Sequence, residues 1–418
     1  MKVRFAFGLP PVLDMWLTVV CAALLFVANL ALDPETGKSV PEIVIRWGYP
    51  TESHKTITGD GYVLTVHRIP HGKTEVDLST PRPIVFLQHG FLGSSTMWVT
   101  NLPHLAFAYL LADSGFDVWM GNMRGNMYST NHTHFSVKSR DFWSFTWDQM
   151  SKYDLTAQID KALATTGQSS LFYVGHSQGC MTMFAKLISE PTFASKIKKF
   201  YAFAPVTAAK NMKGLLALTS RNFYTKFWQL YRKGTYDFLP DSHFFEENRQ
   251  RFCNNPQASV ICSNFIQQLG GPNHQMNTSR LDVFLTEFPA GTSVLNAIHL
   301  AQLIRTGEFK AFDYDDPSLN QKHYGQPIPP QYNLSKIANV NIAVYYSDFD
   351  YIADSKDVEG FILKNVPASV IKQNVKLSRF NHFDFLWGKN ARREIYDPVI
   401  ADMKRLLRRR VSGLQKKK

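Results

Sequence analysis

The stretch that decides the fold runs from Leu171 to Ile188 and reads Leu-Phe-Tyr-Val-Gly-His-Ser-Gln-Gly-Cys-Met-Thr-Met-Phe-Ala-Lys-Leu-Ile. Its first four residues form a continuous apolar run, typical of a strand that is covered on both faces. After the second glycine, apolar residues recur at helical spacing. A tight turn between such a strand and helix strains Ser177 and lifts its hydroxyl clear of the sheet. Gly175 and Gly179 are needed beside it because a β-carbon there would collide with a neighbouring strand or helix.

Apolar runs on either side of this stretch predict the rest of the sheet. Helical periodicity between them, at 105–112 and 153–164, indicates that strands and helices alternate. We therefore expect an α/β fold with a mainly parallel central sheet and helices on both faces. A β-hairpin should precede it, where Gly59-Asp60-Gly61 divides two β-rich runs. The expected strands are Ile84–Leu87, Phe116–Met120, Leu171–Val174 and Ile342–Tyr346.

The alternation stops between about residues 208 and 334. This segment is rich in Phe, Asn, Gln and Arg and contains an amphipathic stretch from Leu215 to Leu230. Since it lies between sheet strands, we expect an inserted cap that covers one end of the sheet. The predicted division is a core of residues 33–207 and 335–400, a cap of residues 208–334 and a basic tail of residues 401–418.

The N-terminus predicts export. Lys2 and Arg4 precede an apolar run from Met15 to Leu32 with small residues near its end, which is typical of a signal peptide over residues 1–32. A single membrane anchor is the alternative, because a run of 18 residues is at the lower limit for spanning a bilayer. A secreted or lysosomal protein would oxidise Cys253 and Cys262, which are nine residues apart in a polar stretch. Three sequons agree with that compartment, at Asn131, Asn277 and Asn333.

Charge is concentrated at the C-terminus. The net charge of the 418 residues is +12, and residues 401–418 hold eight cations against one acid, which leaves +5 over the first 400 residues. A near-neutral body argues against a nucleic-acid partner. The tail is expected to be a solvated helix end, where cations suit the helix dipole. Weak attraction of the tail to anionic membranes is the alternative.

Ser177 is the candidate nucleophile, and a serine hydroxyl needs a base and an acid that orients the base. In chains with this turn the order is serine, acid, histidine. His382 is the histidine that follows the last expected strands, and we predict that it is the base. The acid should follow the strand before it, where Asp348, Asp350 and Asp354 are all candidates.

Two backbone N–H groups should stabilise the oxyanion. We expect one from Gln178, which follows the nucleophile, and one from Phe91, where Gly90 permits the turn. His89 comes too early to be the base and is expected to make structural hydrogen bonds. A metal site is not expected, because His132-Thr-His134 lacks the companion ligands of a zinc site.

With these residues in hand, the chain resembles the acid lipases of animals, the group of gastric lipase and lysosomal acid lipase, from about Pro41 to Ile400. The resemblance implies the α/β-hydrolase fold and hydrolysis of triacylglycerols or cholesteryl esters under acidic conditions, without a cofactor. It implies a triad of Ser177, Asp350 and His382, oxyanion donors at Phe91 and Gln178, and a disulfide between Cys253 and Cys262. The matching stretches are Leu87–Leu92, Phe116–Asn126, Lys152–Leu155, Gly175–Gly179, Pro289–Ser293 and Asn381–Phe385.

The chain departs from the family at three positions near these motifs. Phe91 stands where the family usually has Leu, Cys180 where it has Thr, and Leu269 where it has Cys. We expect Cys180 to be a buried small hydrophobe. The bulk of Phe91 near the acyl site is expected to affect chain-length preference.

The expected partner is a lipid ester at an oil–water or membrane surface, with no nucleic acid and no obligatory protein partner. An aromatic-rich cap favours lipid over soluble substrates. A carboxylesterase or acyltransferase that uses the same triad is one alternative. A non-catalytic binding protein on a hydrolase fold is another, since fold alone does not determine function.

Overall fold

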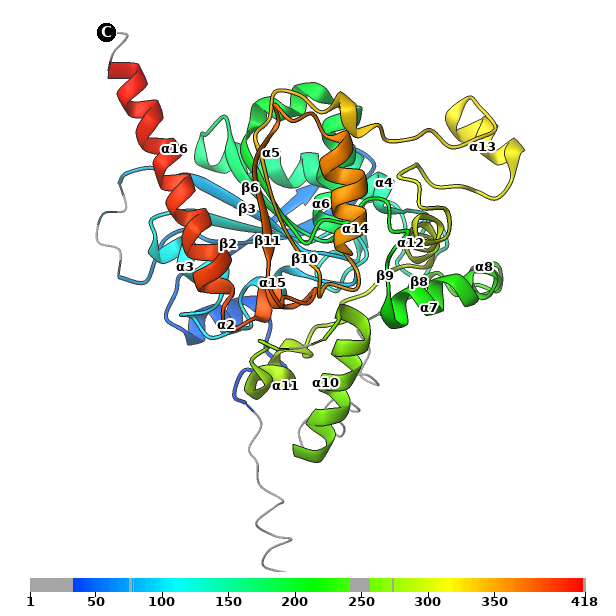
Figure 1. The fold of residues 1–418 in the computed structure, drawn as a ribbon, viewed down its shortest axis with the longest axis horizontal. Helices are drawn as coiled ribbons and strands as arrows, with labels where there is room; N and C mark the ends of the chain where they lie inside the picture. Colours follow the sequence, from blue (N-terminus) through cyan, green and yellow to red (C-terminus); the bar gives the residue numbers. More distant parts are fainter. Residues whose placement is uncertain (1–32, 75–76, 78, 241–255, 273, 416–418) are drawn as a thin grey trace, which may run out of the picture.

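The computed structural model describes residues 33–74, 77, 79–240, 256–272 and 274–415 (Figure 1). Within them, nine strands form one sheet in the order β1-β2-β4-β3-β6-β7-β10-β11, with β5 beside β2. From β4 to β11 in this order, each strand pairs parallel with the next. Strand β2 pairs antiparallel with β1, β4 and β5. The strands are β1 (Glu52–Ile57), β2 (Tyr62–Ile69), β3 (Ile84–Gln88), β4 (Asp117–Gly121), β5 (Asn131–His132), β6 (Leu171–His176), β7 (Ile197–Phe203), β10 (Ile342–Ser347) and β11 (Ile371–Leu377).

The sheet confirms the predicted fold class. The four apolar runs became β3, β4, β6 and β10, which are buried along their whole length, and the predicted hairpin joins β1 to β2. Strand β7 was not predicted because two lysines follow its first residue. Lys199 is nevertheless buried, and its ammonium group lies 2.7 Å from Asp402 Oδ2. An ion pair therefore allows a cation inside the sheet layer.

Helices cover both faces of the sheet. Phe200 and Phe203 on β7 are three residues apart, so their side chains point to opposite faces. Phe200 packs against Phe184 of α6 (Gln178–Ser189), while Phe203 packs against Phe107 of α3 (Phe107–Asp113). Helix α5 (Leu155–Thr166) lies on the same face of the sheet as α6, and α16 (Asp397–Gln415) lies on the same face as α3 (Figure 1). The predicted helices at 105–112 and 153–164 correspond to α3 and α5.

The segment between β7 and β10 is mainly helical (Figure 1). The stretch predicted to be amphipathic is two helices, α7 (Gly214–Asn222) and α8 (Tyr224–Arg232), because the helical path breaks at Phe223. A hydrophobic cluster separate from the main core forms around Tyr224 and Tyr231 of α8 and Val294 and Ile298 of α12 (Val294–Thr306). The other elements are β8 (Asp237–Phe238), α10 (Pro256–Gly270), α11 (Leu281–Phe284), β9 (Thr292–Ser293), α12 (Val294–Thr306) and α13 (Pro317–Tyr324).

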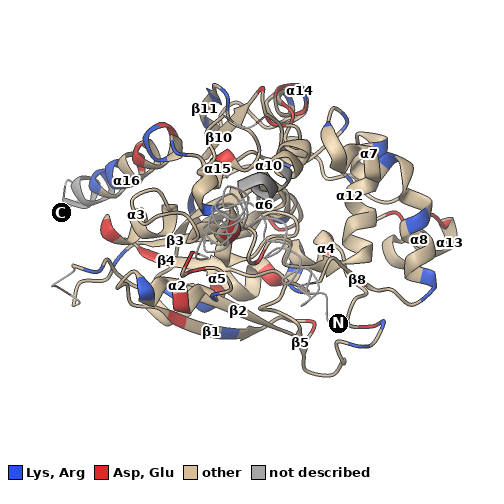
Figure 2. Ribbon diagram, turned by 90° about the horizontal axis from the view of Figure 1, so that it is seen from below, with Lys and Arg blue, Asp and Glu red and all other residues tan. Residues whose placement is uncertain are grey.

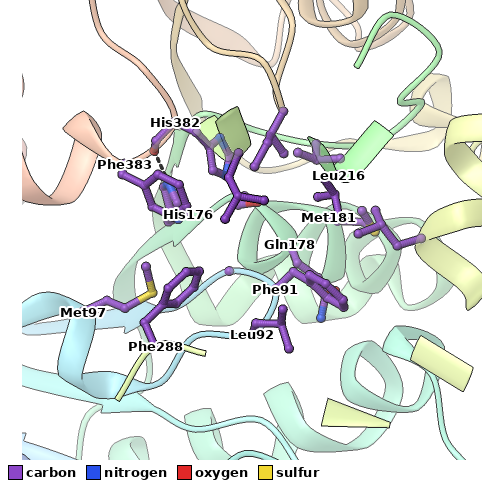
Figure 3. Close-up of a pocket in the computed structure, with 16 residues that line it drawn as sticks. Phe91, Leu92, Met97, His176, Gln178, Met181, Leu216, Phe288, His382 and Phe383 are labelled. Carbon is purple, nitrogen blue, oxygen red and sulfur yellow. Dashed lines mark hydrogen bonds between the residues drawn. The ribbon is translucent and has the colours of Figure 1, made fainter. Parts of the chain in front are cut away.

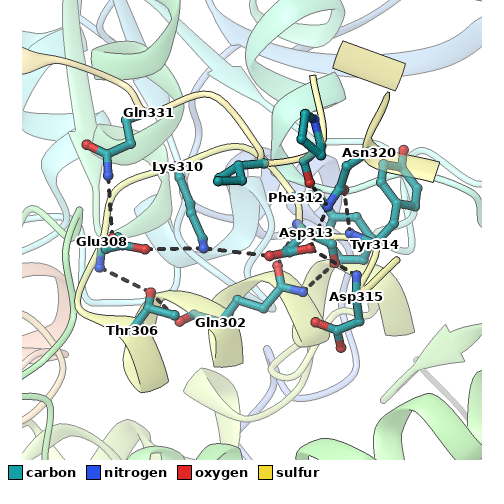
Figure 4. A network of polar contacts seen from close by, with 12 residues as sticks. Gln302, Thr306, Glu308, Lys310, Phe312, Asp313, Tyr314, Asp315, Asn320 and Gln331 are labelled. Carbon is teal, nitrogen blue, oxygen red and sulfur yellow. Dashed lines mark hydrogen bonds and ion pairs between the residues drawn. The ribbon is translucent and has the colours of Figure 1, made fainter. Parts of the chain in front are cut away.

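A polar network fastens the loop after α12 (Figure 4). The Gln302 side-chain amide donates to the Asp313 carbonyl at 2.6 Å and accepts from the Asp313 N–H at 3.0 Å. Asn320 donates to the Asp313 carboxylate at 3.0 Å, and Lys310 pairs with Glu308 at 3.2 Å. These bonds satisfy polar groups where the chain leaves the end of α12.

The structure describes the C-terminal end of the chain further than the N-terminal end. The expected signal peptide, residues 1–32, lies outside the described residues. Within the described ranges, no helix is both long enough and apolar enough to cross a membrane. Helix α16 continues through residues 401–415, so the first part of the expected basic tail is helical.

Candidate active site

Ser177 occupies a strained turn between β6 and α6. Its backbone has φ 55° and ψ −117°, a region that residues with a β-carbon rarely adopt. Its N–H donates to the Phe203 carbonyl at 3.1 Å, which anchors the turn to β7. Cys180, one turn into α6, is buried and is a free thiol, as expected.

Three glycines let other segments approach this turn. A β-carbon at Gly179 would lie 2.5 Å from the Gln88 carbonyl oxygen, and one at Gly175 would lie 2.8 Å from the carbonyl carbon of Gly179. A β-carbon at Gly90 would lie 2.8 Å from Ser177 Cβ. Glycine is therefore required at all three positions, and the loop after β3 lies directly against Ser177.

His382 and Asp350 are joined inside the protein. His382 Nδ1 lies 2.9 Å from Asp350 Oδ2 and 3.1 Å from Oδ1. The backbone N–H groups of Ile352 and Ala353 each donate to Asp350 Oδ1 at 2.8 Å. A fully buried carboxylate with these donors can orient the imidazole and stabilise its charged form. Among the described residues, no hydrogen bond joins His382 to Ser177. In sites of this kind that bond often forms only when substrate binds.

The two other candidate acids lie elsewhere. Asp348 is exposed, and its carboxylate pairs with Lys376 at 2.8 Å. Asp354 caps the short helix α14 (Ser355–Asp357) by accepting the Lys356 N–H at 2.9 Å, and it pairs with Lys213 at 2.5 Å. Of the three, only Asp350 contacts His382.

His176 is a site residue that the sequence analysis did not identify. Its Nε2–H donates to the His382 carbonyl at 2.9 Å, and the two rings lie 4.6 Å apart (Figure 3). Burial, and then the neighbouring His382 ring, lower the pKa of His176 well below its ordinary value. A neutral His176 can hold the backbone of His382 without placing a charge beside it. Its position directly before the nucleophile was the only available signal.

The expected oxyanion donors, Phe91 and Gln178, line the same cavity as Ser177. Gln178 opens α6, so its N–H has no partner within the helix. Within the described part of the chain, neither that N–H nor that of Phe91 donates a hydrogen bond. His89 Nδ1–H donates to the Gly90 carbonyl at 2.8 Å, and Nε2 accepts the Met123 N–H at 3.1 Å. His89 thus has the expected structural role.

Ser177 and His382 line one apolar cavity of about 60 Å³ (Figure 3). This volume holds only a few water molecules. Five apolar residues also line a groove of about 440 Å³ on the outside. They therefore form a wall between the cavity and the groove, and they are Phe91, Leu92, Leu216, Leu269 and Phe288.

Asp384 is a buried carboxyl group near the pair of Asp350 and His382. Its Oδ2 accepts the Asn381 N–H at 2.8 Å, while the Asn381 side chain accepts the Asp384 N–H at 2.9 Å. These two bonds close the turn that carries His382. Burial, and to a smaller degree the Asp350 carboxylate, raise the pKa of Asp384 to about 7. Its Oδ1 has no hydrogen-bond partner among the described residues.

The remaining predicted positions that the structure describes do not line the cavity. Cys262 in α10 is disulfide-bonded, and its expected partner, Cys253, lies outside the described residues. Asn131 and Asn333 are exposed, whereas Asn277 is 8% exposed and its side chain accepts from Ser279. The described residues contain no group of three or more His, Cys, Asp or Glu side chains that could hold a metal ion.

Comparisons with known proteins identify the family of the chain. Residues 40–102 match the family described as a partial α/β-hydrolase lipase region, and residues 83–238 match the α/β-hydrolase fold. The chain is 42% identical to gastric triacylglycerol lipase of Bos taurus, over 91% of this chain and 95% of the relative. It is 41% identical to lipase lipl-3 of Caenorhabditis elegans, over 91% of this chain and 96% of the relative.

Solved structures give the same fold at lower identity. A putative lipase from Sulfolobus solfataricus superposes with a TM-score of 0.52 at 13% identity, over 82% of this chain and 90% of that one. An epoxide hydrolase from Vigna radiata gives 0.50 at 16% identity, over 88% and 99%. With these folds and with relatives at about 40% identity over nine-tenths of its length, the chain belongs to the α/β-hydrolase lipases that include gastric triacylglycerol lipase.

Proposed function

We propose that this protein hydrolyses carboxylic esters of neutral lipids, triacylglycerols or cholesteryl esters, through an acyl-enzyme on Ser177. The observation that carries the proposal is the shared cavity: Ser177 and the Asp350-bound His382 face one apolar space that adjoins a larger apolar groove. An apolar cavity with a few convergent polar groups is typical of a site for an apolar substrate.

In the proposed mechanism, Ser177 Oγ attacks the ester carbonyl carbon while His382 Nε2 takes the hydroxyl proton. The N–H groups of Phe91 and Gln178 stabilise the tetrahedral oxyanion. The C–O bond then breaks, and His382 returns the proton to the leaving alcohol. A water molecule, deprotonated by His382, attacks the acyl-serine, which releases the fatty acid and restores Ser177.

We propose acidic working conditions and a secretory route. Asp384 is neutral below its raised pKa of about 7. At acidic pH its carboxyl group therefore places no second negative charge near Asp350. The disulfide-bonded Cys262 and the exposed sequons at Asn131 and Asn333 support passage through an oxidising compartment. Residues 208–334 would then act as the cap over the ester site.

A substrate panel tests this function. Purified protein should hydrolyse emulsified triolein or cholesteryl oleate faster at about pH 5 than at about pH 7, with a lower rate on a short soluble ester. The Asp348→Asn variant, changed at an exposed carboxylate outside the cavity, serves as the matched control. A preference for the soluble ester at both pH values would contradict the lipid assignment. Transfer of the acyl group to an added alcohol in place of water would indicate an acyltransferase.

A further inference from the structure

The outer groove is bounded by α7, α8 and α10 and is almost wholly apolar. Apart from Thr219 and Lys226, the side chains that line it are apolar. It adjoins the catalytic cavity through the shared wall that includes Phe91 and Leu216. A substrate that approaches Ser177 from this side must therefore leave the phase that contains it when it enters the groove.

Large apolar side chains around the groove are left in solvent. Leu218 of α7 is 58% exposed and Phe265 of α10 is 49% exposed. Phe223, Leu230 and Val260 are exposed in the same region. Isolated exposed apolar residues need no explanation, but a cluster at the rim of an apolar groove indicates a contact surface.

Helix α8 has two different faces. Tyr224 and Tyr231 are buried in the hydrophobic cluster that α8 shares with α12. Phe223, Phe227 and Leu230, on the adjoining side of the helix, line the groove, and Phe227 also packs against that cluster. Phe223 and Leu230, which are 39% and 42% exposed, are therefore the groove-lining side chains of this helix that remain available for another partner.

The charges around this surface have one sign. From residue 208 to residue 236 the chain has no Asp or Glu, and Figure 2 shows blue and no red on α7 and α8. Lys213 pairs with Asp354, but among the described residues Arg221 and Lys226 have no acidic partner. Lys226 lines the groove, and Arg221 lies beside Leu218 and Phe265 in an adjoining hollow. The six cations of the segment are Lys210, Lys213, Arg221, Lys226, Arg232 and Lys233.

We infer that the face formed by α7, α8 and α10 docks on a lipid surface that carries anionic headgroups. The exposed apolar side chains would enter the lipid, while Arg221 and Lys226 would pair with the headgroups. Exposed cations near an anionic surface each strengthen binding about fivefold. The inference rests on the proposed function, because a lipid surface is what would supply an apolar ester to the groove. A protein partner is less suited, since it would not supply that ester.

Flotation with vesicles measures this docking without hydrolysis. The full chain should bind phosphatidylcholine vesicles that contain about 30% phosphatidylglycerol much more tightly than phosphatidylcholine alone, and added salt should weaken the difference. The double variant Arg221→Gln/Lys226→Gln should bind the anionic vesicles about 25-fold more weakly, from two charges at about fivefold each. Its turnover of a short soluble ester should stay at the wild-type value, which separates docking from catalysis.

The matched control removes two exposed cations from α16, in the double variant Arg408→Gln/Arg409→Gln. This variant should bind anionic vesicles within about twofold of the wild type. If it loses as much binding as Arg221→Gln/Lys226→Gln, the basic helix carries the attraction and the inference is wrong. Equal binding of the wild type to neutral and anionic vesicles would also overturn it. Vesicle docking without ester hydrolysis would leave the inference intact and reject the proposed function.

Discussion

Asp350 and His382 are held 2.9 Å apart between Oδ2 and Nδ1, by segments that lie 32 residues apart in the chain. The carboxylate is anchored by two backbone N–H groups from its own loop, those of Ile352 and Ala353. On the other side, His176 holds the backbone carbonyl of His382. His382 is thus held through its ring by Asp350 and through its backbone carbonyl by His176. These contacts leave Nε2 available to face the cavity.

This arrangement predicts the effect of changing each acid in the loop. Asp350→Asn should lower turnover by about 10³-fold or more, because an amide cannot stabilise the charged imidazole. Asp348→Asn should be nearly silent, since Asp348 is exposed and pairs with Lys376. Asp354→Asn should lower the free energy of unfolding by about 1 kcal/mol and spare turnover. Steady-state kinetics and urea unfolding distinguish the three, and a kinetic loss that follows Asp348 or Asp354 instead would reject Asp350 as the acid.

Asp384 predicts how stability changes with pH. Its folded-state pKa of about 7 lies above the ordinary value of 3.8. Asp384 therefore favours the folded state fully below about pH 4 and loses this contribution as the pH rises through about 7. Asp384→Asn should raise the free energy of unfolding at about pH 7 by about 4 kcal/mol and change it by less than about 1 kcal/mol at about pH 4. Urea unfolding across this range measures it.

The exposed carboxylate Asp348 provides the control for this experiment. Asp348→Asn should keep the wild-type dependence of stability on pH between about 4 and 7. If Asp384→Asn also keeps it, the carboxyl group of Asp384 is ionised throughout that range, and its proposed part in the preference for acid has no basis.

We expect Phe91 to affect the preference for acyl-chain length, because its side chain belongs to the wall between the cavity and the groove. Phe91→Leu should thin that wall and raise the kcat/KM ratio of an oleoyl ester to a butyroyl ester by about three- to tenfold. Met97→Leu is the control, since Met97 lines the cavity and not the groove. An unchanged ratio in Phe91→Leu, or an equal change in Met97→Leu, would show that the wall does not select the acyl chain.

The cysteines predict one disulfide. Cys262 is disulfide-bonded, and pairing with Cys253 would close a short loop worth about 2–3 kcal/mol. Peptide mapping without reduction should recover the two fragments linked, with Cys180 as a free thiol. Recovery of Cys253 as a free thiol from the purified, unreduced protein would contradict this pairing.

The sequence predicted the parts of the site that local chemistry determines. Ser177 needs glycine on both sides and a strand before it, and this requirement is visible in the chain. The buried strands were visible for the same reason, because a fully covered strand is a continuous apolar run. Strand β11 was harder to recognise, since its residues alternate between partly buried and exposed at the edge of the sheet.

Long-range contacts could not be predicted in this way. The order of the motif left three acids in one loop as candidates, the family resemblance favoured Asp350, and the fold shows that of the three only Asp350 contacts His382. His176 gave no sign that its ring donates to a carbonyl 206 residues away. The groove and its wall are made by side chains from α7, α8, α10 and the loop after β3, and no single stretch of sequence contains their shape.

The central claim is that Ser177 supplies the attacking oxygen, and the Ser177→Ala variant tests it most directly. A fluorophosphonate probe should label the wild type and the control variant Ser195→Ala, in which an exposed serine is removed, but not Ser177→Ala. Turnover of emulsified triolein by Ser177→Ala should fall by about 10⁴- to 10⁶-fold while its unfolding transition stays that of the wild type. Turnover within tenfold of the wild type by a folded, unlabelled Ser177→Ala would contradict the account.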